Sequence, residues 1–264
     1  MLISCIFATI FYKKTLATQR ISILNTTIDN LSMRETVELI RKKIEAREQI
    51  HHVAVNAGKI VQMQKNLQLR QSVNSCDIIN ADGQAVIWAS KVLNKPLEER
   101  VAGIDLMENL AELAHQNNYK IFLFGAKEEV VADVKNIYSN KYNNGIIAGY
   151  RNGYFSKKDE AQIAQQISDS GAHILFVAIT SPIKENFLYT YREQLKNVNL
   201  IMGVGGSFDV VAGKTKRAPN WMQKIGMEWF YRFLQEPKRM WKRYLVGNTK
   251  FIALVLREKL RGGA

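Results

Sequence analysis

Short runs of apolar and β-branched residues alternate along the chain with longer segments in which apolar residues recur every three or four positions. The longer segments predict helices, and in one of them Ser32 and Glu35 have the spacing of a capping box. The short runs predict strands at 21–24, 52–55, 77–80, 120–124, 146–148, 173–179 and 199–204. This alternation predicts an α/β fold, with a Rossmann-like, mostly parallel sheet and flanking helices.

The pattern changes after Gly213. From Lys214 onward the chain is basic, rich in aromatic residues and mainly helical. We therefore predict three parts: an N-terminal extension at 1–20, a Rossmann-like core at 21–213 and a basic helical appendage at 214–264.

The first twelve residues are apolar and are followed by Lys13 and Lys14. A signal peptide carries its positive charges before the apolar run, whereas this segment carries them after it. No apolar stretch reaches the roughly 18 to 20 residues that a membrane-spanning helix needs. We favour a disordered or weakly membrane-seeking extension, with a signal anchor as the alternative.

Charge is unevenly distributed along the 264 residues, whose formal net charge is +13. Residues 214–264 hold 13 Lys/Arg and 3 Asp/Glu, a net charge of +10, so the first 213 residues carry only +3. Such asymmetry indicates a polyanionic partner: nucleic acid, anionic lipid or a phosphorylated substrate. Two cysteines and four histidines argue against a disulfide framework and against a Cys/His metal site.

The sequence Asn80-Ala81-Asp82-Gly83 directly follows a predicted strand. Ligands of open α/β sheets bind beyond the carboxyl ends of the strands, where a carboxylate such as Asp82 is well placed to act as a base. Gly83 allows a ligand to approach the backbone closely. The alternative is that Asp82 is a turn residue or caps the next helix.

Two further strand ends carry candidate ligand-binding residues. Asn56 follows the strand at 52–55 and can hydrogen-bond a hydroxyl or an amide, or instead cap a helix. The last strand runs into a glycine-rich turn, Gly-Val-Gly-Gly-Ser-Phe-Asp at 203–209. Its backbone N–H groups can hold a diphosphate, and a tight turn without a ligand explains the glycines equally well.

In the basic segment, arginines are interleaved with aromatic residues from Trp221 to Tyr244. The planar, permanently charged guanidinium suits diphosphate oxygens, and Trp and Tyr suit a membrane interface. The alternative is a solvated basic helix whose aromatic side chains pack on the core. The arginines are Arg217, Arg232, Arg239 and Arg243.

Seven short motifs then stand in one order along the chain, and together they resemble the WecG/TagA/CpsF family, glycosyltransferase family 26. The resemblance covers about residues 21–245. The motifs are Asn-Ala-Asp-Gly at 80–83, Val-Ala-Gly-Ile-Asp-Leu-Met at 101–107, Leu-Phe-Gly at 123–125, the glycine-rich turn at 203–209, Arg-Ala-Pro-x-Trp at 217–221, Gly-x-Glu-Trp-x-x-Arg at 226–232 and Glu-Pro-x-Arg at 236–239.

The resemblance implies an inverting, metal-independent glycosyltransferase that needs no cofactor besides its UDP-sugar donor. The transferred group would be an N-acetylhexosamine, N-acetylmannosamine in the best-known members, and the acceptor a polyprenyl-diphosphate-linked saccharide of cell-surface polysaccharide or teichoic acid synthesis. The enzyme would lie peripherally on the inner face of the cytoplasmic membrane. Its partners would include an anionic membrane surface and no nucleic acid.

The resemblance also implies roles for particular residues. Asp82 would be the catalytic base, and no residue would bind a metal. The arginines at the lipid diphosphate would be Arg217, Arg232 and Arg239. Substrate-binding residues would be Asn56, Asn80, Gly83, Gly103, Asp105, Pro182, Glu185, Gly205, Gly206 and Asp209.

Two positions depart from the family's pattern. Members commonly carry Thr-x-Asn at the first strand end, where this chain has Ala-Val-Asn at 54–56. The family's Gly-x-Pro-Lys-Gln-Glu is Thr-Ser-Pro-Ile-Lys-Glu at 180–185, so Lys184 replaces a glutamine. Both changes fall near the expected sugar site and bear on the identity of the donor sugar.

The implied reaction is a direct displacement in which Asp82 takes the proton of an acceptor hydroxyl. Backbone N–H groups near Gly205 and Gly206 and the C-terminal arginines would stabilise the leaving UDP. Three other classes stay open: a nucleic-acid-binding protein, a nicotinamide-dependent sugar-nucleotide enzyme and a non-catalytic homologue. No RRM, KH or helix-turn-helix signature supports the first, and no GxGxxG after the first strand supports the second.

Overall fold

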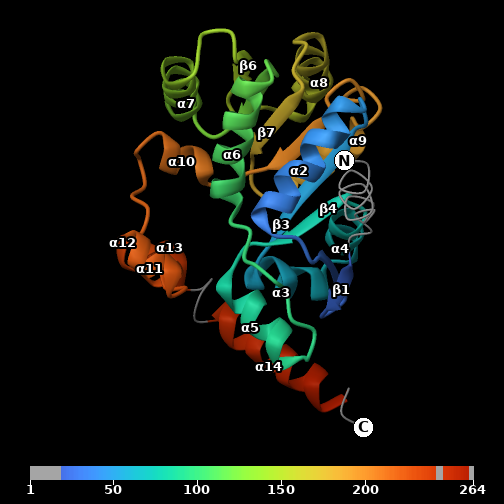
Figure 1. Ribbon diagram of the computed structural model, residues 1–264, viewed down its shortest axis with the longest axis vertical. Helices are drawn as coiled ribbons and strands as arrows, with labels where there is room; N and C mark the ends of the chain where they lie inside the picture. The colour runs from blue at the N-terminus through green and yellow to red at the C-terminus, as the bar shows by residue number, and fades with distance from the viewer. Residues whose placement is uncertain (1–18, 242–245, 262–264) are drawn as a thin grey trace, which may run out of the picture.

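Six parallel strands form the central sheet in a computed structural model that describes residues 19–241 and 246–261 (Figure 1). Their order across the sheet is β4-β3-β8-β7-β5-β6, and every neighbouring pair is parallel. The predicted α/β fold is confirmed. The strands are β3 (Ile50–Val55), β4 (Ile78–Ala81), β5 (Ile121–Gly125), β6 (Ile147–Arg151), β7 (Ile174–Ala178) and β8 (Leu200–Gly203).

The strand predicted at 21–24 is one arm of a hairpin, in which β1 (Arg20–Ile23) pairs antiparallel with β2 (Thr26–Asp29). The sequence pattern missed β2 because the two-residue turn between the arms contains no glycine. Leu24 and Asn25 adopt φ angles of 49° and 58° there, the left-handed conformation that such turns usually give to Asn-Gly. Asp29 joins the hairpin to the sheet by accepting hydrogen bonds from Arg20 Nε (2.9 Å) and from the backbone N–H of Ile79 (2.8 Å).

Helices cover both faces of the sheet and form separate apolar cores there. One face packs against α2 (Met33–Glu45), α6 (Gly103–Gln116), α7 (Glu128–Lys141) and α10 (Ser207–Val211). The opposite face has two clusters, one with α3 (Ala57–Lys65), α4 (Leu67–Asn74) and α5 (Gln84–Val92). The other contains α8 (Glu160–Asp169), which a short 3₁₀ turn η1 (Lys157–Asp159) precedes, and α9 (Ile183–Thr190). The capping box predicted at Ser32 and Glu35 is present at the start of α2.

The C-terminal part of the chain is helical, as predicted, and its last helix returns to the core. Short helices α11 (Asn220–Lys224), α12 (Glu228–Gln235) and α13 (Pro237–Trp241) lie together, and α14 (Gly247–Arg261) runs along α3 and α5 (Figure 1). Phe251 and Val255 of α14 are buried in the same cluster as Ile60 of α3 and Val86 of α5. Helix α14 is therefore part of the packed structure.

The N-terminal extension predicted at 1–20 lies outside the described residues except for its last two. Among the helices that the structure describes, none combines the length and the apolar character needed to span a membrane.

Anchoring of α14 can be tested with two adjacent residues. Phe251 is 2% exposed and Ile252 is 57% exposed. Phe251→Ala should lower the free energy of unfolding by about 3 kcal/mol or more, since it leaves a cavity under the helix. Ile252→Ala should change it by less than about 0.5 kcal/mol. Urea denaturation measures both, and similar values for the two variants would contradict the packing of α14 on the core.

Candidate functional site

Asp82 and Asn56 follow adjacent parallel strands and therefore lie at the same edge of the sheet. Strands β3 and β4 end in register, with Val55 opposite Ala81. The pairing continues one residue further, because the backbone N–H of Asp82 donates to the carbonyl oxygen of Val55 at 2.8 Å. This is the carboxyl edge at which open α/β sheets bind ligands.

Two glycines lie beside Asp82 and Asn56. A Cβ atom at Gly103, the first residue of α6, would lie 3.7 Å from Asp82 Oδ2 and 3.8 Å from Ala54 Cβ. At Gly83 it would lie 3.4 Å from Asn56 Cβ. Asn56, Asp82, Gly83 and Gly103, four of the predicted site residues, are thus brought together.

The sequence left open whether Asn56 and Asp82 cap the helices that follow them. Asn56 is the N-cap of α3, and its Oδ1 accepts a hydrogen bond from the backbone N–H of Lys59 at 3.1 Å. The Nδ2 group of Asn56 is the hydrogen-bond donor of the same carboxamide. The N-cap of α5 is Gly83, and no side-chain hydrogen bond caps that helix. Asn56 therefore has a structural role as a cap.

Asn80 has no exposed surface. Its Nδ2 donates to Thr36 Oγ1 at 3.2 Å, and its Oδ1 lies 2.9 Å from His52 Nε2. Burial lowers the pKa of His52 to about 4, so the imidazole is neutral at physiological pH and its Nε2–H donates to Asn80. The carboxamide of Asn80 thus joins α2 to β3 and β4 beneath the strand ends.

The predicted diphosphate turn carries a second group of site residues. Strand β8 ends at Gly203, Gly205 has a positive φ of 55°, and Gly206 is the N-cap of α10. A Cβ atom at Gly206 would lie 2.9 Å from Arg232 Nη2 and 3.6 Å from Asp209 Oδ2. The guanidinium of Arg232, from α12, therefore lies directly over the glycine turn.

The appendage also touches the chain immediately after Asp82. Gly226, in the turn between α11 and α12, has a φ of 76°. A Cβ atom there would lie 2.5 Å from Cγ of Gln84, the first residue of α5. This close approach leaves room only for glycine, and it seats the turn on the segment that carries Asp82 and Gly83.

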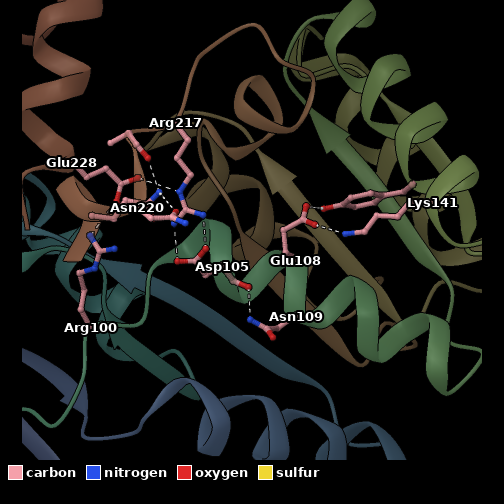
Figure 2. A network of polar contacts seen from close by, with 11 residues as sticks. Arg100, Asp105, Glu108, Asn109, Lys141, Arg217, Asn220 and Glu228 are labelled. Atoms are coloured by element: carbon pink, nitrogen blue, oxygen red, sulfur yellow. Dashed lines mark hydrogen bonds and ion pairs between the residues drawn. The ribbon is translucent and has the colours of Figure 1, made fainter.

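Asp105, predicted to bind substrate, and Arg217, predicted to bind the lipid diphosphate, are paired with each other (Figure 2). Arg217 Nη1 and Nη2 donate to the two oxygens of Asp105 at 2.5 and 2.7 Å. Arg217 Nε lies 3.4 Å from Glu228 Oε1, and Glu228 Oε2 accepts from Arg100 Nη1 at 3.1 Å. Sequence reasoning assigned no role to Arg100 or to Glu228, although Glu228 stands in one of the motifs.

Glu185 lies in a buried cluster of charges beside this edge, at the start of α9. Its Oε1 is 3.4 Å from Lys184 Nζ and 3.6 Å from Lys59 Nζ. Burial alone would raise the pKa of Glu185, but the charges of Lys184 and Lys59, together with weaker hydrogen-bonding contributions, hold the pKa below its usual range. Burial and the charge of Lys184 lower the pKa of Lys59 to about 8. Lys184 extends across Gly203, where a Cβ atom would lie 2.7 Å from its Nζ.

Two predicted site residues, Pro182 and Arg239, make no contact with the groups described above that can be stated from the described part of the chain. Pro182 is exposed at the N-terminal end of α9, next to the buried charge cluster. Arg239 belongs to α13, and its side chain lies outside what the structure describes. Within the described ranges, no three His, Cys, Asp or Glu side chains gather in a way that could hold a metal ion.

Comparison with known proteins supports the resemblance seen in the motifs. Residues 21–264 match the Glycosyl transferase WecG/TagA/CpsF family. The chain is 38% identical over 187 residues to the N-acetylglucosaminyldiphosphoundecaprenol N-acetyl-beta-D-mannosaminyltransferase of Bacillus subtilis (strain 168), covering 71% of each chain. It is 35% identical over 195 residues to the protein of the same name from Bacillus spizizenii, covering 74% of each.

The matched region contains Asp82 with the glycines around it, the glycine turn at the end of β8 and the appendage that contacts both. The match spans far more than half of the chain, and the motif at 226–232 lies against both the glycine turn and the segment that follows Asp82. The protein is therefore a hexosyltransferase that belongs to the WecG/TagA/CpsF family of glycosyltransferases.

Proposed function

We propose that this glycosyltransferase moves N-acetylmannosamine from a UDP-sugar to a polyprenyl-diphosphate-linked N-acetylglucosamine, with inversion at the anomeric carbon and without a metal ion. The observation that carries the proposal is the position of Asp82, between Gly103 and Asn56 at the carboxyl edge of the sheet. The names of the two relatives support the choice of sugars. Incubation with a panel of UDP-sugars and a short-chain diphospholipid acceptor, read by mass spectrometry, tests donor and acceptor together.

Asp82 is the proposed general base. Asp82 Oδ2 lies beside Gly103, which carries no side chain, and in the proposed reaction the acceptor hydroxyl donates to this carboxylate. The carboxylate takes the hydroxyl proton while the oxygen attacks the anomeric carbon, and the bond from that carbon to the UDP oxygen breaks. An attack from the face opposite UDP inverts the configuration.

Stabilisation of the leaving UDP is assigned to the turn after β8 and to Arg232. The backbone N–H groups of Gly205 and Gly206 and the guanidinium above them are donors for the β-phosphate oxygens. Arg232 Nε is buried and, among the described residues, has no hydrogen-bond partner. A buried donor of this kind is available to an anionic ligand.

The membrane is the proposed site of action, because the acceptor is a lipid. Residues 214–264 carry a net charge of +10, and each Lys or Arg near an anionic leaflet contributes about 1 kcal/mol of attraction. Helix α14 turns Phe251 and Val255 to the core but exposes Ile252, Leu256 and Leu260. These three residues recur every fourth position and share one face, next to Lys and Arg side chains that favour an interfacial helix.

Replacement of the proposed base should stop the reaction without unfolding the protein. Asp82→Asn should lower turnover by ~10² to 10⁴, with UDP affinity by calorimetry and the melting temperature nearly unchanged. Asp169→Asn, at the end of α8 and away from the site, is the control. A rate above about half that of the wild type would show that Asp82 is not a general base.

Chelation tests the metal-free mechanism. Turnover should be the same in excess EDTA as in magnesium, because protein N–H groups and arginines are proposed to neutralise the departing diphosphate. Initial rates of UDP release measure this. Loss of activity in EDTA that manganese or magnesium restores would rule the mechanism out.

Membrane docking can be tested by changing only exposed side chains, so that the packing of α14 stays intact. The triple variant Ile252→Ser, Leu256→Ser and Leu260→Ser should sediment less with anionic liposomes at low salt than the wild type. The matched control replaces three exposed apolar residues elsewhere, Leu67, Tyr154 and Tyr189, with serine. Equal binding of both variants would mean that α14 does not face the lipid.

A further inference from the structure

We propose that Asp105, Arg217 and Glu228 form an ion-pair latch that holds the C-terminal appendage over the Asp82 site. In this interpretation the three are positioning residues for sugar transfer, and Arg217 is not a ligand of the lipid diphosphate. The catalytic consequence rests on the proposed function, whereas the contacts that make the latch do not.

The donors of Arg217 are directed to protein carboxylates. Nη1 and Nη2 make the parallel pair of hydrogen bonds to Asp105, and Nε faces Glu228 (Figure 2). A planar guanidinium matches one carboxylate in this two-pronged geometry, which fixes orientation as well as distance. A diphosphate bound by Arg217 would have to displace Asp105, so the role of this arginine is to join two parts of the chain.

The core half of the latch is fixed relative to Asp82. Asp105 lies in the first turn of α6, two residues after Gly103, which faces Asp82 Oδ2. The segment that leads into this turn is held to the strand before Asp82, because the backbone N–H of Val101 donates to the carbonyl oxygen of Ala81 at 3.0 Å. A change in the position of Asp105 therefore requires a change beside the proposed base.

The appendage half of the latch is fixed relative to Arg232. Glu228 is the first residue of α12, and Arg232 lies one turn later on the same helix. The backbone of Lys216, next to Arg217, exchanges two hydrogen bonds with the side chain of Gln235 at the end of α12, at 3.2 and 3.0 Å. Arg217 and α12 thus behave as one unit, and the latch sets the distance between Asp82 and the arginine over Gly206.

The latch is accessible enough to open. The exposed side-chain fractions are 26% for Arg217, 38% for Asp105 and 28% for Glu228. Water and salt compete with ion pairs at this level of exposure. A lipid-linked acceptor and its product can then enter and leave when the appendage lifts, and the latch restores the closed arrangement for each transfer.

The test compares Asp105→Asn and Arg217→Gln, singly and together, in the full-length protein with a short-chain acceptor. Each single change should lower turnover about tenfold, and the double variant should be no slower than the slower single variant, because both changes break the same contact. Hydrogen exchange of the amides at 220–235 should speed up in all three. Asp133→Asn, which removes an exposed ion pair between α7 and Lys214, is the control and should leave turnover and exchange unchanged.

Several outcomes would overturn the latch. Losses that multiply in the double variant would mean that Asp105 and Arg217 act independently and not through their mutual contact. Unchanged exchange at 220–235, or an equal effect of Asp133→Asn, would mean that these ion pairs do not hold the appendage. Exchange is measured without substrate, so it reports on the latch even if Asp82→Asn proves active and the proposed function fails.

Discussion

Strand β3 is hydrogen-bonded to β4 along one side and to β8 along the other, so the carboxyl ends of the three strands reach the same edge of the sheet. The site depends on this pairing. It sets Asn56 beside Asp82, and it brings the turn after β8 next to the turn after β3 although about 150 residues separate them in the chain. The helices that follow β3 and β8 pack on opposite faces of the sheet. Chains that diverge in this way leave a crevice at the strand ends, where α/β proteins bind their ligands.

Polar groups buried near this edge explain how its shape is maintained. Burying a charge or a carboxamide is costly unless the group finds a partner. Asn80 is satisfied by Thr36 and by a neutral His52, and Glu185 lies between two lysines. Asn80 has hydrogen-bond partners on two other elements, whereas the carboxylate of Glu185 is balanced by charge alone, because among the described residues its two oxygens have no hydrogen-bond partner. The first set supports the strands beneath Asp82, and the second fills the space beside Gly203, where a departure from the family's pattern places a lysine.

The sequence allowed the sheet to be predicted well, because buried parallel strands are short, apolar and separated by helical patterns. The hairpin partner β2 was missed, since its turn is made by Leu24 and Asn25 and carries no glycine signal. Among site residues, the glycines at 83, 103 and 206 were identified through motifs, and a side chain at Gly206 would crowd Arg232. Arg100 and Glu228 were not assigned roles, because a single charged residue in a sequence is usually a solvated one. The pairing of Asp105 with Arg217 joins positions 112 residues apart, and no local pattern reports such a contact.

Because α14 packs on the core, the C-terminal appendage is attached to the core at both of its ends. Phe251 and Val255 anchor its C-terminal end in the core, and β8 anchors its N-terminal end. The helices between them therefore form an arch, meaning a segment that is fixed at both ends and is not a free tail. A free tail would sample a large volume in the open state. It would lose this conformational entropy each time it closed on the strand ends, and the loss would oppose closure. An arch holds Arg232 near the glycine turn at a high effective concentration. The ion pairs of Asp105, Arg217 and Glu228 then need to set only the final position of Arg232 relative to Asp82. An appendage held by few contacts can therefore return to the same closed arrangement.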